Sequence, residues 1–244
     1  MQSQSRRNLL KAAALAPAAA LAPAVAVVPI ELLSATTRQA HAYAPDYAEP
    51  ASYLTTAERA FVEAAVARII PADDLGPGAK EANVGVFIDR QLAGPYGRGE
   101  TWYMQGPWKE GAAEQGYQLK LPPAQLYRTA IREIDEYARK QHGGKAFAEL
   151  DAATQDLILD GLEKKKISLP SIPAATFFDM LVQNTVEGFL ADPVYGGNRD
   201  FIGWKLIGFP GPRYNYVAEI EQYGKKYDMP FVSIAGADSG VRGS

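Results

Sequence analysis

The sequence predicts an all-α protein: a single domain of about five to seven helices, with two long segments rich in glycine and aromatic residues. Apolar residues recur at helical spacing in several stretches, and capping residues and prolines mark the ends of these stretches. No pair of alternating apolar runs around a tight turn gives a β-hairpin signal of comparable strength. With 244 residues, 47% of them hydrophobic, the chain can bury one sizeable core.

Composition excludes several kinds of chemistry. The chain has no cysteine, which excludes disulfides, thiolate nucleophiles, thiolate-held iron–sulfur clusters and haem attachment through C-x-x-C-H. Its net charge of −3 lacks the basic excess that is typical of nucleic-acid binding. We therefore do not expect nucleic acid as a partner.

Residues 1–42 predict a twin-arginine export signal. Arg6 and Arg7 lie in a charged start that precedes a weakly apolar stretch at residues 12–28. That stretch is short for a bilayer, and two prolines would interrupt a helix there. An export signal is therefore favoured over a membrane anchor.

A cleavage pattern of the A-x-A type follows, formed by Ala40 and Ala42. It predicts a mature periplasmic domain of residues 43–244, which ends in an extended C-terminal tail. The mature chain then keeps one histidine, His142. Because this residue precedes a glycine pair, we expect it at a helix C-terminus rather than in a catalytic or metal site.

Local signals place the expected helices. Thr55 and Glu58 form a capping box that starts a helix, which Pro71 ends. Asp73 and Asp74 follow, and these paired carboxylates suit a turn better than a metal site. Further helices are expected around Lys80–Leu92, from Pro122–Pro123 to about Gln141, from Asp151 through Leu162, and from Pro173 through Phe189.

The two remaining long segments are the unusual part of the chain. Residues 94–118 combine six glycines with five aromatic residues, and residues 188–211 contain Gly196-Gly197-Asn198, which we expect at positive φ, and then a short helix. Aromatic residues and arginine anchor many protein interfaces. The predicted partner interface comprises Trp102, Trp108, Tyr195, Asn198, Arg199, Asp200 and Trp204. The alternative is that these side chains pack the segments onto their own core, and the sequence leaves both open.

Known catalytic and cofactor motifs are missing from the sequence. There is no dinucleotide-binding G-x-G-x-x-G, phosphate loop, G-x-S-x-G elbow or H-E-x-x-H helix. We therefore predict no catalytic, cofactor-binding or metal-binding residue in this chain. Since twin-arginine cargo folds before export, often around a cofactor, the signal suggests a bound partner that holds one.

Four segments carry a resemblance that agrees with this interpretation. They are Leu54–Ala72, Val86–Tyr96, Trp102–Trp108 and Asp192–Asp200. Together with the export signal they resemble the gluconate 2-dehydrogenase subunit 3 family, and the similarity covers nearly the whole mature chain.

The resemblance implies a non-catalytic small subunit of a periplasmic dehydrogenase of gluconate or a related polyol or sugar. In such complexes a large flavoprotein subunit with FAD oxidises the substrate, and a multihaem cytochrome c subunit passes electrons to quinone. The small subunit is needed for maturation and export of the flavoprotein. The complex is peripheral to the inner membrane, so membrane association would come only through partners.

A second hypothesis is an independent periplasmic carbohydrate-binding protein or enzyme. In that case the three tryptophans would line a sugar pocket with Asn198, Arg199 and Asp200. The aromatic rings would stack on sugar faces while the polar side chains bind hydroxyl groups.

Overall fold

A computed structural model of the chain describes residues 52–109, 111–112, 115–213, 215–227 and 229–235. This part of the chain is all-α, as predicted, with seven α-helices and no β-strand. The expected export signal and its residues Arg6, Arg7, Ala40 and Ala42 lie outside the described residues. The helices are α2 (Thr56–Ile69), α3 (Val84–Ala93), α4 (Pro95–Arg98), α5 (Pro123–Gln141), α6 (Ala152–Glu163), α7 (Ala174–Leu190) and α8 (Ile202–Ile207).

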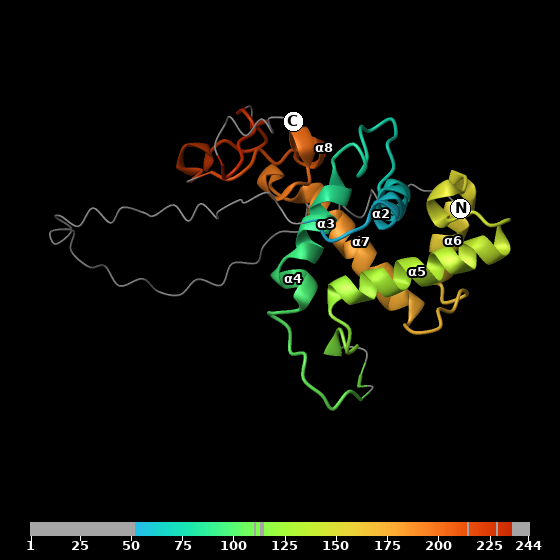
Figure 1. Ribbon diagram of the computed structural model, residues 1–244. Helices are drawn as coiled ribbons and strands as arrows, with labels where there is room; N and C mark the ends of the chain where they lie inside the picture. The colour runs from blue at the N-terminus through green and yellow to red at the C-terminus, as the bar shows by residue number, and fades with distance from the viewer. Residues whose placement is uncertain (1–51, 110, 113–114, 214, 228, 236–244) are drawn as a thin grey trace. The chain divides into compact units, whose positions relative to one another are not determined.

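Helix α7 is the centre of the domain, because it packs against α2, α3, α5, α6 and α8 (Figure 1). Four buried aromatic side chains form the core where α2, α5 and α7 meet the short 3-10 helix η3 (Phe147–Glu149). Phe61 lies 4.7 Å from Phe147 and 6.4 Å from Phe177, and Tyr127 meets Phe177 edge-on at 5.3 Å between ring centroids. Such tilted and edge-on pairs add to the free energy of apolar burial.

Several predicted helix ends are confirmed. Thr55 and Glu58 form the expected capping box at the start of α2. Asp151 caps α6 by accepting a hydrogen bond of 3.0 Å from the backbone of Thr154. His142 is the C-cap residue of α5, where a helix end was expected.

The turn after α2 also forms as predicted. Asp73 and Gly76 exchange two backbone hydrogen bonds, and the Asp73 carboxylate accepts the N–H of Leu75 at 2.8 Å. This is an Asx turn, in which the short acidic side chain substitutes for a backbone acceptor. The turn therefore accounts for Asp73 at this position.

Two helices differ from the sequence interpretation. Helix α3 begins at Val84, four residues later than expected, because Asn83 has a left-handed conformation with φ 64° and residues 80–83 form turns instead. The first glycine-rich segment contains the unpredicted one-turn helix α4, which begins at Pro95. Proline directly after a glycine was the available signal, since proline favours the first position of a helix.

Candidate partner-docking site

Glycines hold the second aromatic-rich segment tightly against the end of α7. A Cβ atom added at Gly197 would lie 2.1 Å from the carbonyl oxygen of Gly188. One added at Gly203 would lie 1.9 Å from the carbonyl oxygen of Phe189. Only glycine permits this approach of two backbones, so the loop has one well-defined position on the helix.

Asn198 fixes the middle of the loop from the inside. Its fully buried side chain donates to the carbonyl of Ala191 and accepts from the N–H of Gly203, both at 2.8 Å. The expectation of positive φ is confirmed for Gly196 and Asn198 but wrong for Gly197, whose role is close packing. Asn198 therefore acts within the chain, as the packing alternative predicted.

The sequence did not reveal two further strained residues. Asp200 and Phe201 have φ values of 55° and 58°, which side chains with a Cβ rarely adopt. They lie at the junction of the 3-10 helix η5 (Arg199–Phe201) and α8. Strain of this kind persists only where the surroundings enforce it, and it concentrates at functional sites.

Trp204 is internal rather than a surface anchor. Only 4% of the residue is exposed, its indole N–H donates to the carbonyl of Leu190 at 2.7 Å, and its ring stacks on Phe201 at 5.5 Å. With its ring face and its only donor both in use, burial favours the packing alternative for Trp204.

Other predicted interface residues on this loop do reach the surface. Tyr195, at the end of the 3-10 helix η4 (Pro193–Tyr195), is 43% exposed. The side chains of Arg199 and Asp200 are 61% and 79% exposed and form a loose ion pair of 3.8 Å. These three residues occupy a rigid stretch of six positions, which suits recognition by a partner.

The first aromatic-rich segment has an anchored end and an open end. The ring of Trp102 packs edge-on against Tyr96, with 5.8 Å between centroids, and at a tilt against Tyr117, with 4.9 Å between centroids. Burial raises the pKa values of both tyrosines, and the Tyr117 hydroxyl donates to the carbonyl of Leu121. Trp108, by contrast, is 42% exposed, in a stretch that extends away from the helices (Figure 1).

Two buried aspartates, both missed as site residues, hold the outer segments of the described chain. Asp89 on α3 accepts the backbone N–H groups of Tyr53 and Leu54, each at 2.8 Å, and pairs with Arg59. It thereby fixes the first described residues of the chain to α3. Its place beside apolar residues on one helix face was the available signal.

Asp192 holds the C-terminal segment in a similar way. Its carboxylate accepts the hydroxyl of Ser233 at 2.5 Å and the N–H of Ile234 at 2.8 Å. Phe231 adds a ring contact to Phe201 at 5.9 Å. The C-terminal segment is therefore part of the domain surface next to the loop. Its contacts join residues about 40 positions apart, which local sequence patterns could not predict.

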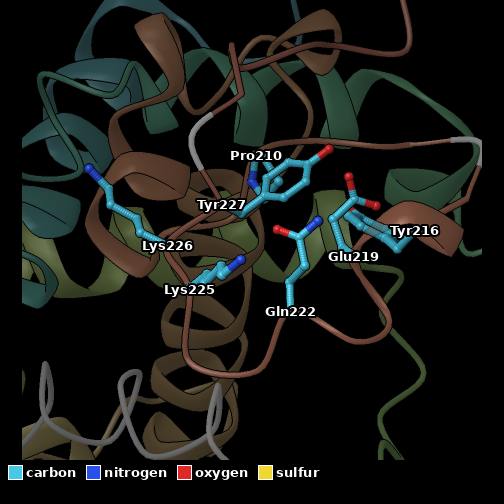
Figure 2. Close-up of a pocket in the computed structure, with 7 residues that line it drawn as sticks. All are labelled: Pro210, Tyr216, Glu219, Gln222, Lys225, Lys226 and Tyr227. Carbon is cyan, nitrogen blue, oxygen red and sulfur yellow. The ribbon is translucent and has the colours of Figure 1, made fainter.

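The tail carries an open hollow of about 280 Å³ (Figure 2). Its lining mixes aromatic and polar side chains from Pro210, Tyr216, Glu219, Gln222, Lys225, Lys226 and Tyr227. The second cavity described, of about 310 Å³, lies between α6 and α7. Neither is lined by the tryptophans, Asn198, Arg199 or Asp200, so neither is the sugar pocket that the second hypothesis expected.

In the part of the chain that the structure describes, acidic and histidine side chains do not gather in groups of three or more that could hold a metal ion. None of the helices in this part is long and apolar enough to cross a membrane.

Comparison with known proteins gives one match. The profile of the family described as gluconate 2-dehydrogenase subunit 3 matches residues 56–211. The match begins in α2 and ends just after α8, so it includes both aromatic-rich segments. No curated protein and no solved structure matches the chain.

Proposed function

Because the chain belongs to the gluconate 2-dehydrogenase subunit 3 family, we propose that it is a non-catalytic small subunit of a periplasmic, FAD-dependent dehydrogenase. It binds the flavoprotein subunit, stabilises it and brings it across the inner membrane through its own twin-arginine signal. The flavoprotein carries FAD, and a haem c subunit accepts the electrons. The substrate class is gluconate or a related polyol or sugar.

The family match carries this proposal, and the surface geometry supports it. Tyr195, Arg199 and Asp200 are presented on a loop whose backbone is fixed by Asn198 and two glycines. A preorganised surface loses little conformational entropy when a partner binds. This is the property that a subunit interface needs.

Export of the partner provides the test. We expect the double substitution Arg6→Lys and Arg7→Lys to leave both this chain and the flavoprotein in the cytoplasm, and to abolish periplasmic dehydrogenase activity. The matched control is Arg38→Lys, a conservative change outside the arginine pair. Fractionation and dye-linked activity measure the outcome. Normal periplasmic activity in the double variant would refute the escort role.

The hollow on the tail favours a second candidate function, carbohydrate binding. Tyr216 and Tyr227 meet there at 5.6 Å, with Glu219, Gln222 and Lys225 as hydrogen-bonding groups (Figure 2). Calorimetry of the purified chain with gluconate and hexoses tests it. Binding that Tyr216→Ala removes would support this candidate, and the absence of heat from the wild-type chain would dismiss it.

A further inference from the structure

Among the arginines of the described chain, Arg90 is the one whose side chain has no ion pair or hydrogen bond. Seven of the others pair with a carboxylate, and Arg213 donates to the Tyr227 hydroxyl and to backbone carbonyls. Arg90 has neither kind of partner within this part of the structure. Its Nε is the buried side-chain nitrogen or oxygen atom there that lacks a hydrogen bond. A buried donor without an acceptor destabilises a folded protein, so this one requires an explanation.

The position of Arg90 links it to the docking loop. A Cβ atom added at Gly196 would lie 2.8 Å from Nη1 and 3.2 Å from Cζ of Arg90, so the guanidinium lies directly against this glycine. Gly196 has φ +99° and follows the exposed Tyr195. The last turn of α3 favours a positive charge there electrostatically but leaves Nε without an acceptor.

We propose that Arg90 is the binding site for a carboxylate side chain of the flavoprotein subunit, with Tyr195 as the adjacent aromatic contact. This inference rests on the proposed function and names the point of contact. A guanidinium is planar and always charged, so its two terminal nitrogens can form a two-pronged hydrogen bond to a carboxylate. The carboxylate of an aspartate or glutamate on the partner would bind the two terminal nitrogens of Arg90, while Nε stays buried behind them.

The occupant is a protein carboxylate rather than a free sugar acid. Neither of the two cavities described is lined by Arg90, whereas small-molecule sites are concave and enclose most of their ligand. The neighbouring Tyr195 is 43% exposed, and tyrosine is enriched at protein interfaces. These features suit an extended protein surface.

The test uses Arg90→Met, which keeps an apolar stem and removes the unpaired donor. We expect the melting temperature of the subunit to stay at or above that of the wild type, while the affinity for the purified flavoprotein falls roughly 30-fold or more. Arg90→Lys should lose less, because it keeps the charge without the planar fork. The matched control is Arg139→Met, which removes a half-exposed arginine from α5 and should leave the affinity unchanged.

Three outcomes would overturn the proposal, and they are distinguishable. If wild-type subunit does not bind flavoprotein, the proposed function fails together with this inference. If wild type and Arg90→Met bind equally well, or if Arg90→Met weakens binding only by unfolding the subunit, the inference alone fails. If sodium gluconate binds the isolated chain and Arg90→Met abolishes that binding, the occupant is a free acid instead.

Discussion

The two aromatic-rich segments have similar compositions but differ in how far Trp108 and Trp204 are buried. In residues 188–211, glycines contact the backbone of α7, and Trp204 is only 4% exposed. In the stretch around Trp108, Gly106 makes only ordinary contacts, Gly116 has open space around it, and Trp108 is 42% exposed. Close glycine packing occurs in both segments, since a Cβ atom added at Gly97 would lie 1.9 Å from the carbonyl oxygen of Leu92. The difference lies next to the tryptophans: Gly203 contacts the backbone of α7 beside Trp204, whereas a Cβ atom at Gly106 would meet Trp108 only at an ordinary distance.

The largest effect is expected for Trp204→Ala, which tests whether Trp204 is a core residue. Loss of a core tryptophan should lower the free energy of unfolding by about 3 to 5 kcal/mol, which corresponds to a melting temperature roughly 6 to 20 °C lower. Thermal melts of the subunit measure it. If the melting temperature were unchanged and flavoprotein binding were weaker, Trp204 would be an interface residue and not a core residue.

A second substitution tests the glycine contacts themselves. Gly197→Ala forces a methyl group against the carbonyl of Gly188 and should cost about 3 kcal/mol of stability. Gly94→Ala in the other segment is the matched control, because its nearest new contact is an ordinary 3.4 Å. We expect this control to melt within a few degrees of wild type. Equal melting temperatures for the two variants would contradict close packing at Gly197.

Local signals in the sequence were sufficient to predict most of the helical framework. The capping box at Thr55, the cap at Asp151 and the glycine pair after His142 depend on residues close together in the chain. Such signals specify helix ends with little help from tertiary structure. The all-α class followed from them.

The site could be predicted only in part, because its decisive contacts are long-range. Sequence could mark Trp204 and Tyr195 as unusual, but not which of them α7 would bury. Whether Arg90 has a hydrogen-bond partner depends on which residues pack around α3. The hydrogen bond from Ser233 to Asp192 joins residues that are 41 positions apart in the sequence. Positive φ at Phe201 is likewise enforced by surroundings and contradicts the local preference of the residue.

At Trp108, in the first aromatic-rich segment, we expect a substitution to affect partner binding more than stability. Trp108→Ala should change the free energy of unfolding by less than about 0.5 kcal/mol, since 42% of the residue is exposed and it lies outside the helical core. If Trp108 contacts the flavoprotein, the affinity should fall roughly 10- to 30-fold. Titration of the variant with flavoprotein checks this, with Tyr103→Ala as a control at a more exposed ring of the same segment. Wild-type affinity would confine the interface to the second segment.

The smallest expected effect concerns the anchored end of the first segment, at Tyr117. Burial, and to a lesser degree the nearby Tyr96, raises the pKa of Tyr117 above its ordinary value of 10.0. As the pH rises through 10, the Tyr117 hydroxyl loses its proton in the unfolded chain before it does so in the folded chain. The stability that Tyr117 contributes is therefore complete below pH 10 and declines above it. Tyr117→Phe should lower the free energy of unfolding by about 1 kcal/mol near neutral pH, because the hydrogen bond to Leu121 is lost. Above pH 10, the difference in free energy of unfolding between the variant and the wild type should become smaller. Denaturant melts across this range measure the gap, and a constant gap would show that Tyr117 ionises equally easily in both states.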